Sequence, residues 1–133
     1  MTRPLKFRAR HHVAGNWHYG FLVERNGKTF IFEQDGGQLR EYQVDPKTVG
    51  QFTGLTDKNR KEIYDADLVS FLVENPDTEE LVVVKAQIFW SDKLGGWYAQ
   101  NLRNSLDIIS FNQNFSNGCE AIGNIHENPE LLK

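Results

Sequence analysis

The sequence has few of the residues that stabilise small folds covalently or through metals. It holds one cysteine among 133 residues, which excludes a disulfide framework and a cysteine-based zinc cluster. Its apolar runs stay well below the ~20 residues that a membrane-spanning helix needs, so we expect no membrane association. Apolar residues do not recur with a helical period over any window of roughly eleven residues. Helices are therefore expected to be minor.

The composition is that of an ordinary globular domain. Apolar residues make up 39% and charged residues 25% of the chain, so a packed core is expected without metals or disulfides. The net charge of −3 gives no overall attraction to nucleic acid. The first residues lack the apolar core of a secretory signal, and with a single thiol we expect a cytoplasmic protein.

The N-terminal part has the pattern of a β-meander. Leu5, Phe7 and Ala9 alternate with a basic set, and this is typical of a half-buried strand with a cationic outer face. The basic set is Lys6, Arg8 and Arg10. Asn26-Gly27 and Asp35-Gly36-Gly37 separate β-prone runs, and such pairs favour tight hairpin turns with positive φ.

The remainder also predicts short strands. Turn signals recur every eight to twelve residues, roughly the spacing expected of a sandwich or barrel. We predict a mostly β protein with a small SH3-like barrel over about residues 50–126 and the meander packed on it. The chain is treated as one domain, 1–133, with a possible subdivision into 1–48 and 49–133. Glu130-Leu131-Leu132 predicts one terminal helical turn.

Three segments of this chain resemble the YopX family, small proteins of phages and prophages. They are Lys6-Phe7-Arg8-Ala9, the stretch from Thr53 to Val69, and the stretch from Ile122 to Leu132. Together they extend almost from end to end. The resemblance implies an SH3-like β fold and an origin in a mobile element, and it implies no known reaction.

Two positions depart from the family pattern. Arg60 stands where the family has a glycine after Asp-Lys-Asn, and Ala66 stands where it has the glycine of a Glu-Gly pair. If those glycines adopt positive φ, Arg60 and Ala66 require either a different turn or some backbone strain.

Three carboxylates in the central segment are candidate site residues. Asp57 opens a run like that of a calcium loop, but Lys61 and Glu62 then stand where a ligand and a glycine are needed. A turn in which Asp57 accepts backbone N–H groups fits better. Asp65 and Asp67 have strand spacing, so a shared face is predicted; such a pair either transfers protons or faces water beside nearby cations.

Histidine and cysteine give no catalytic or metal constellation. His11 and His12 are adjacent, so on a strand they face opposite sides and cannot share one metal. Cys119 leads into an apolar strand, which is typical of a packed core residue. We predict no catalytic residue, no metal site and no cofactor.

Two binding functions remain. Nucleic-acid binding would use the Lys6, Arg8 and Arg10 face together with Trp97 and Tyr98, although aromatic residues at this spacing are more often core. Protein binding or self-assembly would join the basic strand to an acidic region such as Asp77-Glu79-Glu80 of a neighbour. We predict a non-catalytic protein-interaction or self-assembly module, a homo-oligomer included, with nucleic-acid binding as the alternative.

Overall fold

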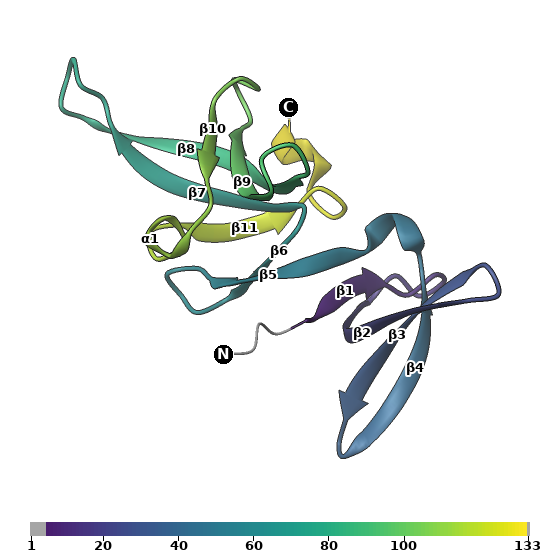
Figure 1. The fold of residues 1–133 in the computed structure, drawn as a ribbon. Coiled ribbons are helices and arrows are strands. Elements are labelled where there is room, and N and C mark those ends of the chain that lie inside the picture. Colours follow the sequence, from purple (N-terminus) through teal and green to yellow (C-terminus); the bar gives the residue numbers. More distant parts are fainter. Residues whose placement is uncertain (1–4, 133) are drawn as a thin grey trace. The chain divides into compact units, whose positions relative to one another are not determined.

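The computed structural model describes residues 5–132, and antiparallel strands make up most of them (Figure 1). This confirms the mostly β prediction. The chain divides into two compact units, Met1–Phe52 and Thr53–Lys133. The strand β5 (Gly50–Thr56) runs from the first unit into the second.

Unit 1 is a meander. Its other elements are β1 (Phe7–Arg10), β2 (Trp17–Arg25), β3 (Lys28–Asp35), β4 (Gln38–Val44) and the 3-10 turn η1 (Pro46–Thr48). The sheet has the strand order β4-β3-β2-β1-β5-β6, and its last strand, β6 (Glu62–Tyr64), belongs to unit 2. Asn26 and Gly27 have φ of 55° and 76°, and Gly36 and Gly37 have φ of 56° and 85°. Both predicted hairpin turns are therefore confirmed.

The core of unit 1 is small. Ala9, Ile31 and Val44 are buried, and Phe7 and Leu22 pack against them. β1 lies between β2 and β5, so both of its edges are paired, and its Ala9 is a fully buried member of the core. The core of this unit therefore lies directly beside the basic strand.

Unit 2 holds a second antiparallel sheet. Its elements are β6 (Glu62–Tyr64), β7 (Asp67–Glu74), β8 (Leu81–Ser91), β9 (Gly96–Asn101), β10 (Ile108–Ser110), the helical turn α1 (Gln113–Ser116), β11 (Glu120–Asn124) and the 3-10 turn η2 (Pro129–Leu132). Five of the strands pair in the order β10-β9-β8-β7-β11. Over residues 5–132 these pairings form an open sheet, and the predicted closure into an SH3-like barrel is not seen.

The core of unit 2 brings distant segments together. Ile63, Val69, Ile88, Ala99 and Cys119 are among its buried members. These residues come from β6, β7, β8, β9 and the position just before β11. The core therefore packs the five-stranded sheet against β6. Strand alternation explains the selection, since Ala86 and Ile88 on β8 face inward while Lys85 faces out.

Two short helical elements lie in the C-terminal part. The turn η2 at Pro129–Leu132 confirms the predicted terminal helical turn. The helical turn α1 was not predicted from the sequence. Asn112 caps it, accepting the Phe115 N–H at its side-chain oxygen over 3.0 Å.

Candidate interaction surface

Asp57 organises the central loop through its carboxylate. Oδ1 accepts the backbone N–H groups of Asn59 and Lys61 at 2.8 and 2.9 Å. Oδ2 accepts the N–H of Ala121, 64 positions away, at 2.9 Å. The predicted capping role is confirmed, and it joins the loop to β11. The oxygens are thus held by the fold, which favours a structural role for this side chain over ligand binding.

Electrostatics agree with this role. Burial alone raises the pKa of Asp57, but the N–H groups of Ala121, Lys61 and Asn59, with the Lys61 charge, outweigh it and lower the pKa below its ordinary value. The carboxylate is therefore ionised at neutral pH and stabilises the loop as an anion.

The predicted shared face of Asp65 and Asp67 is wrong. Asp65 and Ala66 form the turn between β6 and β7, and only Asp67 lies on a strand. Asp67 is buried and its Oδ2 accepts the N–H of Tyr64 at 2.7 Å. The spacing was right for a strand, but a tight turn places the two carboxylates differently, and Asp67 closes that turn.

Arg60 and Ala66 both adopt the positive φ that was expected of a glycine. Their φ angles are 67° and 74°, in the left-handed region. Ala66 is fixed there because its N–H donates to the carbonyl of Ile88 at 2.9 Å and its carbonyl accepts the N–H of Ile125 at 3.1 Å. The turn geometry expected from the glycines is therefore kept without them.

Ala66→Gly is expected to stabilise the protein. It keeps both hydrogen bonds and removes a Cβ that is unfavourable at positive φ, so the free energy of unfolding should rise by about 0.5–1 kcal/mol after the entropy of the new glycine is deducted. Urea denaturation measures it. Ala121→Gly, in β11, is the matched control and should destabilise. A loss of stability in Ala66→Gly would contradict the strain.

The basic strand is not the cationic stripe that was predicted. Arg8 is only 6% exposed, and its guanidinium lies 4.7 Å from the Trp17 ring centroid. Its predicted exposure is wrong, because Trp17 of the neighbouring strand β2 packs against the guanidinium. Arg10 donates its Nε–H to the carbonyl of Gly15 at 2.9 Å. Lys6 lies 5.5 Å from the ring centroid of Phe52, also in unit 1.

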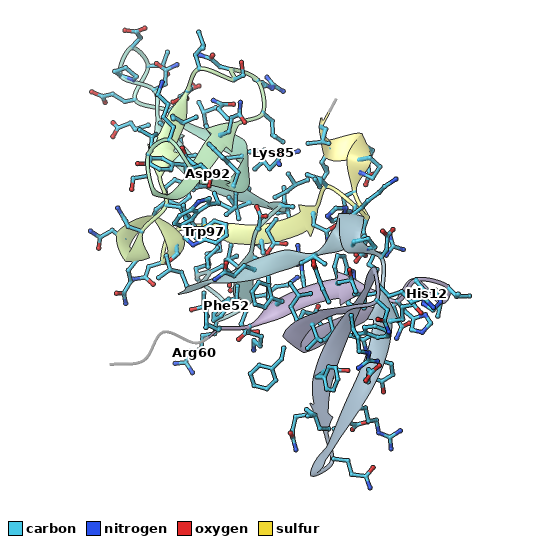
Figure 2. All side chains as sticks on the ribbon, turned by 45° about the vertical axis from the view of Figure 1, so that its right-hand side comes forward. His12, Phe52, Arg60, Lys85, Asp92 and Trp97 are labelled. Atoms are coloured by element: carbon cyan, nitrogen blue, oxygen red, sulfur yellow. The ribbon has the colours of Figure 1, made fainter. Side chains whose placement is uncertain are left out.

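The aromatic pair is tied to its own sheet. Trp97 packs against the core of unit 2 and contacts Trp90 edge-to-face, with ring centroids 5.3 Å apart. Trp90 donates its indole N–H to Asp92 at 2.9 Å. Tyr98 lies 6.2 Å from Phe89, centroid to centroid. Figure 2 labels Trp97 on β9 and Asp92 in the turn before it. These contacts favour packing over a base-stacking platform.

The Cys119 thiol is buried in the core of unit 2, and the His18 imidazole is held by contacts within unit 1. Burial, and then the Asp57 charge, raises the pKa of Cys119 to about 11, so the thiol is protonated at neutral pH. His18 stacks on Tyr42 at 3.8 Å and its Nδ1 lies 2.9 Å from Glu33 Oε1. Among residues 5–132, no group of three or more His, Cys, Asp or Glu side chains is placed to hold a metal.

The β7–β8 hairpin supplies a surface that the sequence analysis missed. Its outer half extends beyond the rest of its sheet, as Figure 1 shows. We call this outer half, residues 71–84, the arm. Its strands are regular, with Leu72 opposite Val83 and Val73 opposite Val82. Asn75 closes the tip by donating its N–H to the carbonyl of Glu80 at 2.8 Å. The arm is therefore a well-formed ribbon.

The arm exposes apolar side chains on both faces. Leu81 and Val83 on one face are 66% and 59% exposed, and Val82 on the other is 46% exposed. Leu72 and Val73 are exposed beside them on β7. A two-stranded ribbon with this much exposed apolar surface is marginal in water, and a patch of this kind is a candidate contact surface.

One edge of the arm is open to an incoming strand. β9 pairs with β8 from Ala86 to Ser91, and within the described part of the chain no strand borders β8 at residues 81–84. On the β7 side, β11 pairs as far as Ser70, and Phe115 of α1 packs against Phe71 with ring centroids 4.7 Å apart. The β8 edge at residues 81–84 is an available template for pairing.

A groove of about 870 Å³ follows the open edge. It lies between the start of β8, the segment after β9, and η2. Its lining residues are Val82, Val83, Val84, Lys85, Asn101, Leu102, Arg103, Leu131 and Leu132. Lys85, labelled in Figure 2, and Arg103 are exposed and give this mostly apolar groove a positive border.

Within residues 5–132, no helix combines the length and the apolar character needed to cross a bilayer.

A family model and a solved structure each match nearly the whole chain. The family model described as YopX protein matches residues 6–133. A crystal structure of protein EF1440 from Enterococcus faecalis is similar in fold, with a TM-score of 0.61 and 24% sequence identity, over 99% of this chain and 100% of that one. No curated protein matches the sequence.

Proposed function

The chain belongs to the YopX protein family, and on that premise we propose that it is a non-catalytic protein-interaction module whose contact surface is the arm. The observation that carries the proposal is the pairing of an open strand edge with exposed apolar side chains on both faces of the ribbon. Such an edge binds an extended polypeptide through main-chain hydrogen bonds, while side-chain pockets beside it give selectivity.

The groove suits an added strand. An extended segment paired with residues 81–84 would place alternate side chains toward Leu131 and Leu132. Apolar residues with few charges are therefore expected at those positions of the partner. This is the chemistry of a protein partner, and it needs no titratable group.

Nucleic-acid binding is the alternative. It would need the basic strand, yet Arg8 is buried against Trp17 and Arg10 is bonded to Gly15. The aromatic pair on β9 is engaged in its own sheet. These contacts leave a smaller accessible cationic and stacking surface than the sequence predicted, and they weigh toward protein binding.

The wider setting that we propose is cytoplasmic, in the life cycle of a phage or prophage. A single buried cysteine with a protonated thiol fits a reducing compartment. The mobile-element origin is what the resemblance to the YopX family implies. Neither bears on the choice of contact surface.

Retention experiments in the native host test the proposal. Tagged wild type, Val83→Lys and the control Leu94→Lys are purified with and without nuclease. Leu94, like Val83, is an exposed apolar residue, but it lies in the β8–β9 turn. Wild type and Leu94→Lys should retain a polypeptide, which can be an untagged copy of this chain. Val83→Lys should bind that polypeptide about tenfold more weakly, a loss of ~1.4 kcal/mol of binding free energy.

The other outcomes are equally defined. Equal retention by all three proteins would show that the arm is not the contact surface. Nucleic acid that is retained without nuclease, and a retained polypeptide that is lost with it, would favour the alternative function. Retention of nothing under any condition would overturn the proposal.

A further inference from the structure

We propose that the arm binds a second copy of this chain, edge to edge along β8, in an antiparallel two-fold pairing centred on Val82. The inference deepens the proposed function and rests on it. It names both the occupant of the open edge and the register in which the occupant binds.

Symmetry limits the possible registers. Two antiparallel copies of one strand are related by a two-fold axis perpendicular to the sheet, so each residue keeps its face in both copies. Opposed residues of a ladder share a face, and faces alternate along a strand. Only registers centred on a single residue satisfy both conditions. Along the open edge that residue is Leu81, Val82, Val83 or Val84.

Residue pairing selects among these registers. A ladder centred on Val83 would place Leu81 opposite Lys85, and Glu80 opposite Ala86, which already pairs with β9. A ladder centred on Val84 would overlap still more of the segment that pairs with β9. Centring on Leu81 would oppose Glu80 to Val82 and bring the two acidic tips together. Centring on Val82 opposes Leu81 to Val83 twice and ends the ladder before β9 begins. This register joins apolar side chains at its middle.

Charge complementarity supports the same register. The tip of the arm carries three exposed acids, Asp77, Glu79 and Glu80. With Val82 at the axis, the tip of one copy lies along residues 84–85 of the other, where Lys85 and Arg103 border the groove. The contact between acidic tip and basic border occurs twice, once on each side of the axis. Opposite charges so placed guide the partner into register.

This contact differs from the one that the sequence predicted. There, the acidic region met the basic strand of a neighbour. In the structure Arg8 of that strand is buried, while Lys85 and Arg103 lie beside the edge that an incoming strand would use. The acidic half of the predicted contact is kept, and its basic half moves to the arm.

A pair of charge-reversed chains tests the register. One chain carries Glu79→Lys and Glu80→Lys, and the other carries Lys85→Glu and Arg103→Glu. Each chain alone places like charges at both contacts, so we expect its self-association to be weakened about tenfold or more. Mixed together, the two chains have opposite charges at both contacts and should form a heterodimer. Sedimentation velocity over a concentration series measures all three samples and wild type.

A control separates register from general attraction between oppositely charged chains. Val82→Lys is added to both reversed chains, which puts two lysines at the axis and should abolish the heterodimer. Persistence of the heterodimer would overturn the register. A wild type that stays monomeric at every concentration would overturn self-pairing. In that case, retention of another polypeptide that depends on Val83 would leave the proposed function standing, and its absence would remove both.

Discussion

Asp57→Ala is expected to lower the free energy of unfolding by about 3–5 kcal/mol at pH 7. The change removes three hydrogen bonds in which the charged carboxylate accepts the N–H groups of Asn59, Lys61 and Ala121. A hydrogen bond to a charged group contributes about 1.5–3 kcal/mol, and less at the exposed Asn59 and Lys61, where water can replace the acceptor. The loop would also lose its link to β11. Urea denaturation of wild type and variant gives the difference.

The pH dependence of the effect has a definite sign. The folded pKa of Asp57 lies below its ordinary value of 3.8, so the unfolded chain takes up the proton first as pH falls. The stabilisation is present above the unfolded pKa and is lost as pH falls through that value toward the folded pKa. The difference between wild type and Asp57→Ala should therefore be greatest near neutral pH and should shrink below about pH 4.

A matched carboxylate provides the control. Asp77 lies exposed at the tip of the arm, and Asp77→Asn should change stability by less than about 0.5 kcal/mol. If Asp57→Ala were as mild as Asp77→Asn, the loop would be held by other contacts and the structural role of Asp57 would be wrong.

Local turn chemistry was predictable because its causes lie within a few residues. Asn26-Gly27 formed its hairpin turn as expected, since both residues tolerate positive φ. Asp57 was expected to accept N–H groups of its own loop, and it does. Its bond to Ala121 joins positions that are distant in sequence, and spacing alone could not reveal it.

Features set by neighbouring strands were not predictable from one strand. Alternation placed Arg8 on the face opposite Ala9 correctly, but its burial depends on the strands on either side of β1. Asp65 and Asp67 had strand spacing, yet the turn at Ala66 separated them. In both cases contacts outside the strand decided the outcome: Trp17 packs against Arg8, and Ile88 and Ile125 hold the turn at Ala66.

The arm illustrates the same limit at larger scale. The apolar run from Leu81 to Val84 is typical of a strand buried on both faces. Its exposure arises because β9 and β11 stop short of it, and strand lengths elsewhere in the sheet decide that. The sequence pattern of residues 81–84 is typical of a buried strand, but in the structure these residues form the candidate contact surface. Only a comparison of the lengths of adjacent strands could have signalled it.

Gly20→Ala is expected to destabilise unit 1 by about 3 kcal/mol. A Cβ at position 20 would lie 2.1 Å from the carbonyl oxygen of Phe32. That neighbour is backbone of β3 and cannot move aside as a flexible side chain could. The two strands would have to separate, and Glu33 would lose its contacts with His18 and the N–H of Tyr19.

Hydrogen exchange localises this effect to one unit. Gly20→Ala should speed exchange of the Ile31 amide in unit 1 and leave that of Ile88 in unit 2 unchanged. Gly96→Ala is the control, because the nearest atom to its new Cβ is a Tyr98 ring carbon at 3.7 Å, an ordinary contact. Equal acceleration at Ile31 and Ile88 would show that the two units unfold together. Protection unchanged at both would contradict the close approach of β2 and β3.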